Sequence, residues 1–321
     1  MVVAVAVIIG GGWAVLRYLT QWEGTAAYAA SGQQDEAPER TIAIIATLAP
    51  TPSVAVGVET PASPTPDPFD EMRAKPLLLP LQSEVLEEIA YENDSYLLNI
   101  QRVKLGETVS LVADIRFKGA CTIATAFAKD TFGRNYLEKT STIAKNNGAQ
   151  LAINGDYYGY RDDGIIVREG KLYRNEPVRD MFCIYSDGRA VVVNEAEADV
   201  DAMLVDGLLH TFSFGPVLVH AFAPVEELKT DVFPKNPRSA IGMVSPGHFK
   251  LVVVDGRQQG YSEGYDMEEL AAFMAGLGCE IAYNLDGGNT ATMYYADAVI
   301  SKPSGAGNYE RTISDIIYLM P

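Results

Sequence analysis

The sequence predicts an α+β fold of mixed β-sheets with packed helices, in a single domain that follows an N-terminal membrane segment and a linker. Short apolar runs, such as residues 249–254 and 281–285, end in turns that contain Gly, Asp or Asn. Residues 266–277 carry a helical apolar stripe behind a capping signal. The chain of 321 residues, 48% of them hydrophobic, is long enough for one large domain.

Residues 1–19 are predicted to form a transmembrane or signal-anchor segment. Residues 2–16 carry no charge, and Arg17 follows them. The run is shorter than the roughly 20 residues of a typical spanning helix, and a buried core helix is the alternative. With an anchor here, we expect the protein at the cell membrane with its folded domain outside the cytoplasm, or secreted.

Residues 20–76 have the composition of a tether. Ala, Thr, Ser, Gln and Pro dominate, and prolines at positions 61, 64, 66 and 68 exclude a helix or an interior strand. We expect an extended, polyproline-like linker that leads into a domain over residues 77–321.

The first half of this domain alternates short elements. A capped helix is predicted at 83–89, and strands between residues 96 and 117, where apolar and polar residues alternate. A helix that ends at Gly148 leads into a strand at 150–153. Two hairpins follow, turning at residues 169–170 and 187–188.

The second half is richer in buried strands. A strand at 212–219 enters through a Gly-Pro bend, and residues 249–254 should form a central strand. Asp266 and Glu269 have the spacing of a capping box, and the helix that they open leads into the strand at 281–285, which closes a β-helix-β unit. A hairpin at 294–300 and a strand at 313–319 end the chain.

Composition excludes several classes of function. The formal net charge is −17, which argues against nucleic acid as a partner. Three Cys without a CxxC spacing, and three scattered His, favour neither a disulfide framework nor a metal site, and we expect no cofactor. No G-x-S-x-G motif is present. Because acids far outnumber plausible bases, carboxylate chemistry is the simplest expectation.

Two strand ends carry polar residues that could serve a site. The strand at 281–285 ends in Asp286, Gly287 and Gly288, where a flexible turn can aim the carboxylate into a cleft. The alternative is a turn whose Asp caps backbone N–H groups. The strand at 150–153 likewise ends in a polar run that contains Asp156, and the alternative there is a tyrosine-rich turn that packs on the core.

Arginine and a third strand end complete the candidates. Arg238 begins a strand after Pro237 and suits bidentate recognition of phosphate or carboxylate; a surface arginine or a structural ion pair is the alternative. The strand at 249–254 ends in Asp255. A divalent cation among Asp156, Asp255 and Asp286 is conceivable, but no ligand spacing supports it.

Together these segments resemble the phosphodiester glycosidase family over about residues 77–321. The motifs that carry the resemblance are NGDYY at 154–158, FSFGP at 212–216, NPRSAIG at 236–242, VDGR at 254–257, GYSEG at 260–264 and NLDGG at 284–288. One departure is Asn289-Thr290, where members of that family usually carry a third Gly and a Ser.

The resemblance implies hydrolysis of a glycosyl-phosphodiester at the sugar C1–O bond, with a carbohydrate phosphodiester as the substrate. Asp286 is the expected nucleophile or general base, and Asp156 and Glu263 compete for the other carboxylate role. Asp255 is expected to orient the loop, and Arg238 and, more weakly, Arg311 to bind the phosphate. The sugar hydroxyls are expected to contact Asn154, Asn284 and Tyr157. The binding turn is expected to contain Gly287 and Gly288. The alternatives are a non-catalytic, tethered glycan- or cell-wall-binding module, and a glycosyl transferase.

Overall fold

The computed structural model describes residues 7–9, 12–14, 79–228, 234–305 and 307–321. Contacts within the chain divide it into two units, Met1–Ser63 and Pro64–Pro321. In the first unit, β1 (Val7–Ile9) and β2 (Gly12–Ala14) pair as an antiparallel hairpin. The predicted linker at 20–76 lies outside the described residues.

The predicted membrane segment is therefore described only in part. The residues of it that the structure describes form two short strands and not a helix. Across the described part of the chain, no helix combines the length and the apolar character needed to cross a membrane.

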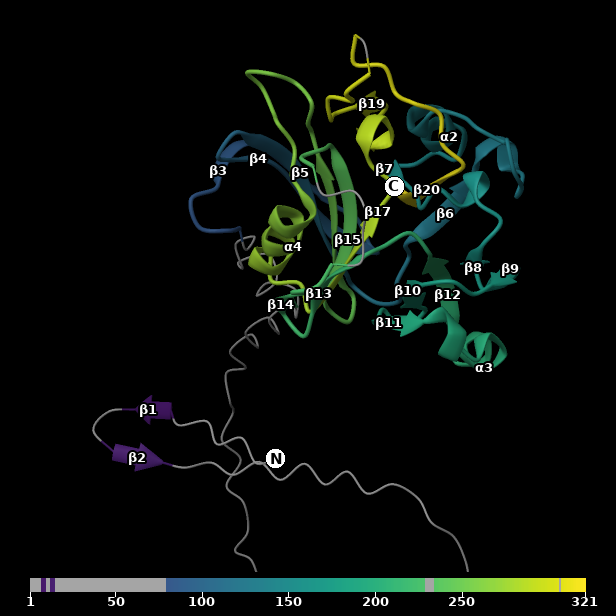
Figure 1. Cartoon of the computed structure of the whole chain (residues 1–321), viewed down its shortest axis with the longest axis horizontal. Helices are drawn as coiled ribbons and strands as arrows, with labels where there is room; N and C mark the ends of the chain where they lie inside the picture. The colour runs from purple at the N-terminus through teal and green to yellow at the C-terminus, as the bar shows by residue number, and fades with distance from the viewer. Residues whose placement is uncertain (1–6, 10–11, 15–78, 229–233, 306) are drawn as a thin grey trace, which may run out of the picture. The chain divides into compact units, whose positions relative to one another are not determined.

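The second unit is built mostly of β-strands with few helices, which agrees with the predicted α+β class (Figure 1). Its largest sheet is antiparallel throughout and has eight strands. Their order is β14 (Ala223–Pro224), β13 (Val217–His220), β17 (Ile281–Leu285), β15 (Arg238–Ser245), β16 (His248–Val254), β5 (Thr108–Phe117), β4 (Tyr96–Leu105) and β3 (Glu84–Glu92).

Three smaller sheets complete the β structure. A five-stranded sheet runs in the order β19 (Ala298–Val299), β18 (Met293–Tyr295), β7 (Leu151–Asn154), β20 (Asp315–Leu319) and β6 (Ala124–Phe127). A three-stranded sheet has the order β11 (Ala190–Asn194), β10 (Asp180–Tyr185) and β12 (Leu208–Phe212). The hairpin of β8 (Gly164–Arg168) and β9 (Lys171–Glu176) turns at residues 169–170, as predicted, and β8 packs against β10 and β12.

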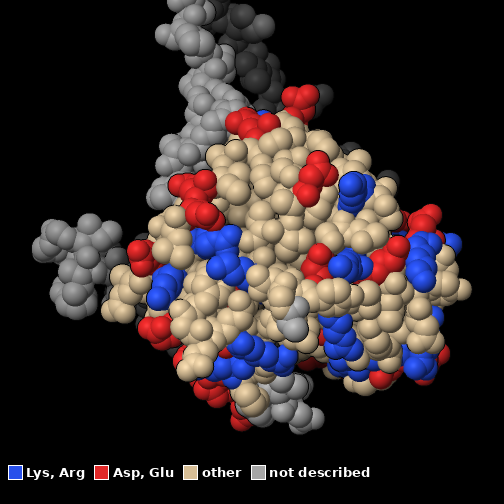
Figure 2. All heavy atoms as spheres, turned by 90° about the horizontal axis from the view of Figure 1, so that it is seen from above, with Lys and Arg blue, Asp and Glu red and all other residues tan. Residues whose placement is uncertain are grey.

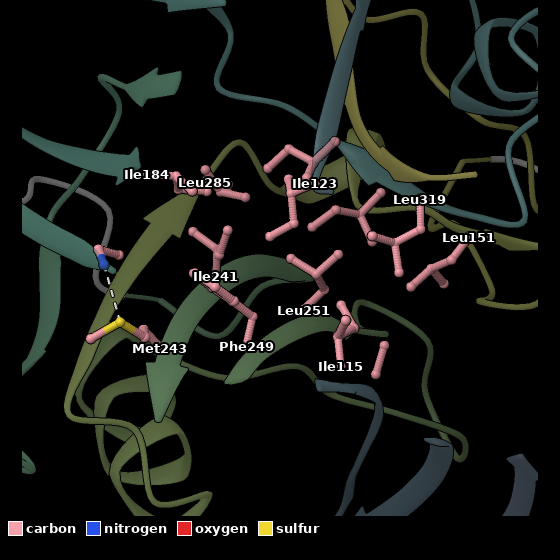
Figure 3. Close-up of a cluster of buried hydrophobic side chains, with 14 of the residues drawn as sticks. Ile115, Ile123, Leu151, Ile184, Ile241, Met243, Phe249, Leu251, Leu285 and Leu319 are labelled. Carbon is pink, nitrogen blue, oxygen red and sulfur yellow. Dashed lines mark hydrogen bonds between the residues drawn. The ribbon is translucent and has the colours of Figure 1, made fainter. Parts of the chain in front are cut away.

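The main hydrophobic core lies where the three larger sheets meet. Its side chains come from β5, β15, β16 and β17 of the large sheet and from β7, β10 and β20 of the smaller ones. Figure 3 shows Ile115, Ile241, Leu251 and Leu285 of the large sheet with Leu151 and Leu319 of the five-stranded one. Within this core Met243 accepts a 3.1 Å hydrogen bond at sulfur from the backbone N–H of Ala190.

Three helices cover the sheets. Helix α4 (Met267–Gly276) begins at Asp266 with the predicted capping box to Glu269, and packs on the opposite face of the large sheet. Strand β16 is thus covered on both faces, which explains its unbroken apolar sequence. Helix α2 (Thr140–Asn146) packs on the five-stranded sheet, and α3 (Val200–Val205) packs beside β12.

Two predictions of local structure need correction. Residues 83–89 form strand β3 and not a helix, because a ladder of hydrogen bonds to β4 outweighs the local helix signal. The strand predicted at 212–219 is two strands in different sheets, β12 and β13, separated by the cis Gly215–Pro216 bond. The predicted β-helix-β unit is confirmed: β16, α4 and β17 follow one another, and β16 and β17 run parallel because each pairs antiparallel with β15, which lies between them.

Candidate active site

Asp286 follows the last residue of β17, at a point where segments far apart in the chain converge. Its backbone N–H donates to the carbonyl of Gly155 (3.3 Å), and its Oδ1 accepts from the backbone N–H of Gly287 (2.9 Å). Asp286 therefore does cap a backbone N–H group of its turn, as the alternative interpretation of the sequence stated. A Cβ at Gly287 would lie 2.8 Å from the carbonyl oxygen of Pro237, so only glycine lets the two loops come this close.

The carboxyl group of Asp286 is perturbed by its surroundings. Burial among protein atoms raises its pKa to about 6, because the charged form loses hydration. Hydrogen bonds from Thr290 and Gly287 oppose that rise, as do the positive charges of Arg311 and Arg161. The group is thus mainly ionised at neutral pH but close enough to its pKa to exchange a proton, which suits a nucleophile or a general base.

A cleft of about 190 Å³ opens beside Asp286. The polar residues that line it come from three segments and are Asn236, Arg238, Arg257, Asn284 and Asp286, with Gly287 and Gly288 at the turn. The structure thus brings together the strand-end candidates Arg238, Asn284 and Asp286, as the sequence predicted.

Arg238 lies at the wall of this cleft and is 5% exposed. Its Nε donates to the carbonyl of Tyr265 (3.0 Å) and its Nη2 to that of Pro234 (2.9 Å). Burial lowers the pKa of Arg238 to about 10, so the guanidinium keeps its charge at neutral pH. Arg238 therefore supplies positive charge from a fixed position.

Asn284 is the buried amide of the cleft. Its Nδ2 donates to the carbonyl of Gly215 (2.8 Å), whereas its Oδ1 has no hydrogen-bond partner among the described residues. A buried acceptor without a partner is costly, and a hydroxyl group of a bound ligand could satisfy it.

Asn154 lies beneath the cleft and not in it. Its Nδ2 donates to the backbone carbonyl of Asp286 (2.6 Å), and its Oδ1 accepts from Ser239 Oγ (2.7 Å) and from the backbone N–H of Thr292 (3.3 Å). The side chain is fully buried, so these bonds fix the ends of β7 and β17. The geometry gives Asn154 a positioning role in place of the expected contact with sugar.

Asp156 is also turned inward. Its side chain is fully buried, lies 3.1 Å from Nη2 of Arg168, and accepts from the backbone N–H of Ser213 (3.0 Å). The same Nη2 lies 2.8 Å from Oδ2 of Asp315. Burial raises the pKa of Asp315 to about 7, and the charge of Asp156 adds to that rise. This geometry does not favour Asp156 as the second carboxylate of the reaction.

Glu263 and Asp255 lie away from the cleft lining. The Glu263 side chain is 56% exposed and lies 3.4 Å from the ammonium group of Lys235. Asp255 is buried and accepts from the hydroxyl of Tyr261 (2.8 Å) and the backbone N–H of Lys302 (2.8 Å). Burial raises the pKa of Asp255 to about 6. Asp255 therefore has the contacts of a loop-orienting residue, the role expected for it.

A narrow gap, too small to admit a water molecule, adjoins Asp286 on the side of the aromatic turn. It is lined by Gly155, Tyr157, Tyr160 and Asp315, among others, together with Asp286. The rings of Tyr157 and Tyr160 are stacked, with centroids 4.3 Å apart. Tyr157 thus belongs to the site region, as predicted, but its ring packs against a neighbouring tyrosine.

Sequence reasoning missed Arg257 and Arg161. Arg257 lines the cleft, donating from Nε to Asn236 (2.8 Å) and from Nη1 to Oδ1 of Asn289 (3.2 Å). The VDGR run contains it, but only its acid was considered. Arg161 follows the aromatic turn, and a single arginine in a loop gives no periodic signal.

No group of three or more His, Cys, Asp or Glu side chains in the described residues is arranged to hold a metal ion. The three described Cys are buried and unpaired. The polar lining of the cleft is thus made of carboxylate, amide and guanidinium groups, which suits a polar, anionic ligand.

The domain is rich in β-strands, and its cleft is lined by the carboxyl group of Asp286 together with Arg238 and Arg257. The chain belongs to the phosphodiester glycosidase family, whose model matches residues 147–320. Membership supports hydrolysis of glycosidic phosphodiesters in general.

Similar proteins extend the comparison. A prophage-derived uncharacterized protein of Bacillus subtilis, YomE, is 29% identical over 196 residues, which cover 57% of this chain and 28% of that protein. The chain thus spans less than a third of that relative.

Solved structures share the fold. The catalytic domain of zebrafish N-acetylglucosamine-1-phosphodiester alpha-N-acetylglucosaminidase, auto-inhibited by its pro-peptide, superposes with a TM-score of 0.55 and is 21% identical, covering 77% of this chain and 84% of that one. A hypothetical protein from Synechocystis has a TM-score of 0.50 and 13% identity, covering 73% and 64%.

Proposed function

We propose that this protein hydrolyses a glycosyl-phosphodiester at the sugar C1–O bond and releases free sugar, acting on an extracellular glycan or cell-envelope substrate. The observation that carries the proposal is the carboxyl of Asp286, with its raised pKa, in a cleft that Arg238 and Arg257 also line. The apolar run at residues 2–16 and the proline-rich run after it support a location at the membrane, outside the cytoplasm.

In the proposed reaction the C1–O bond breaks and the phosphate monoester departs with the bonding electron pair. A phosphate monoester is a good leaving group, so it needs less acid assistance than a sugar alkoxide. Positive charge from Arg238 and Arg257 stabilises the negative charge that develops on it. A single ionised carboxylate can then suffice, which agrees with the absence of Asp156 and Glu263 from the cleft lining.

Asp286 acts either on the water molecule that attacks C1 or on C1 itself. As a general base it takes a proton from the water that attacks C1; as a nucleophile it forms a glycosyl ester that water then cleaves. The free Oδ1 of Asn284 accepts a sugar hydroxyl. The anomer that forms first, followed by NMR, separates the two routes, since the base route inverts C1 and the nucleophile route retains it.

The test of the proposed function is Asp286→Asn with a set of sugar-1-phosphodiesters. The variant keeps the size of the side chain but can neither accept a proton nor attack C1. We expect release of free sugar to fall by at least about 10³-fold, as for loss of a catalytic base or nucleophile. Full turnover by the variant would remove Asp286 from the mechanism. Unchanged glycan bound by both proteins, without hydrolysis, would identify a binding module in place of an enzyme.

A further inference from the structure

Two arginines outside the cleft, Arg161 and Arg311, stand over the aromatic rings next to Asp286. The guanidinium of Arg161 lies 5.4 Å from the ring centroid of Tyr157 and 4.7 Å from that of Phe214. The guanidinium of Arg311 lies 5.4 Å from the centroid of Tyr160. The rings of Tyr157 and Tyr160 are themselves stacked, so both cations lie over one aromatic cluster next to Asp286.

Neither of these arginines forms an ion pair within the described part of the chain, and the charges of both act on the carboxyl of Asp286 from a longer distance. Arg161 donates a hydrogen bond to the carbonyl of Ser213 (3.3 Å), and no carboxylate there forms an ion pair with Arg161 or Arg311. Other arginines do pair with carboxylates, namely Arg102, Arg116, Arg134, Arg168, Arg179 and Arg189. In a chain of net charge −17 with abundant acids, two unpaired arginines at one site indicate an anion from outside the chain.

Figure 2 shows several groups of lysine and arginine side chains on the face in view, with acidic side chains between and around them. A guanidinium that stacks on an aromatic ring keeps its N–H edge available, and that edge matches phosphate or carboxylate oxygens.

We propose that the substrate carries a second anionic group, a phosphate or a carboxylate, which Arg161 and Arg311 bind while Arg238 and Arg257 hold the scissile phosphodiester. This inference rests on the proposed function. Asp286 lines the cleft and lies next to Tyr157 and Tyr160, over whose rings Arg161 and Arg311 stand, so a substrate that reacts at Asp286 is near both arginine pairs. The substrate class is then an acidic sugar joined through phosphate, or a repeat of sugar phosphates.

Binding to the Asp286→Asn variant tests this without a catalytic readout. The probes are glucose 1-phosphate, glucose 1,6-bisphosphate and glucuronic acid 1-phosphate, measured by calorimetry. We expect at least one of the two probes with a second anionic group to bind about 10-fold more tightly than glucose 1-phosphate, the effect of one additional charge-assisted contact. Preference for the bisphosphate identifies phosphate as the second anion, and preference for the glucuronate identifies carboxylate.

Variants on the Asp286→Asn background assign the preference to the arginines. The double substitution Arg161→Gln with Arg311→Gln should abolish the preference for a second anionic group and keep the affinity for glucose 1-phosphate. The substitutions Arg161→Lys and Arg311→Lys should retain part of that preference. Arg189→Gln is a matched control, because Arg189 also stacks on a tyrosine, Tyr185, at 3.6 Å. Arg189→Gln should leave the affinities for all three probes unchanged.

Two outcomes separate the failure of this inference from that of the proposed function. Equal affinity for all three probes would overturn the second anion site and leave the phosphate cleft standing. Binding of none of them would overturn both proposals. A preference that survives the double glutamine substitution would also overturn the assignment to Arg161 and Arg311.

Discussion

The side-chain amide of Asn154 donates a 2.6 Å hydrogen bond to the backbone carbonyl of Asp286, a residue 132 positions later in the chain. This bond joins the end of β7 in the five-stranded sheet to the end of β17 in the eight-stranded one. The position of the candidate catalytic carboxylate therefore depends on how two sheets meet, and not on the local turn alone.

Replacing Asn154 by Ala should damage both stability and activity. Three buried groups lose their partner: the carbonyl of Asp286, the hydroxyl of Ser239 and the N–H of Thr292. We expect a loss of about 2–3 kcal/mol in the free energy of unfolding, measured in urea, and a fall of about 100-fold in kcat/KM. Asn194→Ala, at an exposed helix cap, is the control and should leave kcat/KM unchanged. Wild-type turnover in Asn154→Ala would contradict the positioning role.

The rate should depend on the ionisation of Asp286. Because its pKa is raised to about 6, the ionised form predominates only above that pH. We expect kcat/KM to rise about tenfold per pH unit below pH 6 and to level off above it. Removing the two opposing positive charges with Arg161→Gln and Arg311→Gln should move this midpoint to higher pH. A midpoint near pH 4, the ordinary value for Asp, would show that the carboxyl is not perturbed as the geometry indicates.

Arg168 should be a stability residue. It is 2% exposed and lies between the buried carboxylates of Asp156 and Asp315. Arg168→Met leaves both acids without their cation, and we expect a loss of about 3–5 kcal/mol in the free energy of unfolding. Adding Asp156→Asn and Asp315→Asn to that variant should recover part of the loss, because the uncompensated charge is gone. If the triple variant is no more stable than Arg168→Met, charge compensation is not what Arg168 supplies.

Arg257→Ala should weaken catalysis on phosphodiesters specifically. Arg257 is exposed at the cleft, so its loss should change the free energy of unfolding little. We expect kcat/KM for a sugar-1-phosphodiester to fall about 100-fold, while a 4-nitrophenyl glycoside, which has no phosphate, loses nothing. An equal loss on both substrates would mean that Arg257 does not act on the phosphate.

Much of the site could be predicted because strand ends are visible in sequence. The runs before Asp286 and Asp255, and the run that Arg238 begins, are mostly apolar, so we expected the polar residues next to them at the ends of buried strands. The cleft does gather Arg238, Asn284, Asp286 and the two glycines. Their catalytic and binding roles remain predictions.

The direction of a side chain at a strand end could not be predicted. Asp156 and Asp286 each come just after a short buried strand, in a segment that contains glycine. Asp156 nevertheless points to a buried arginine, whereas Asp286 points to the cleft. The partner of Asp156, Arg168, comes from a different hairpin, and only tertiary packing places it there. The β3 error has the same origin, since the partner strand β4 decided the conformation of residues 83–89.

The pairing of β5 with β16 limits how the chain can be shortened. The family match begins at residue 147, whereas β5 spans Thr108–Phe117 and pairs with β16 from His248–Arg116 through Val254–Ser110. A fragment trimmed to the matched residues would expose β16 as an apolar edge strand, and exposed apolar edge strands promote aggregation. A soluble expression fragment of this protein must therefore start before β4, at the latest near residue 95.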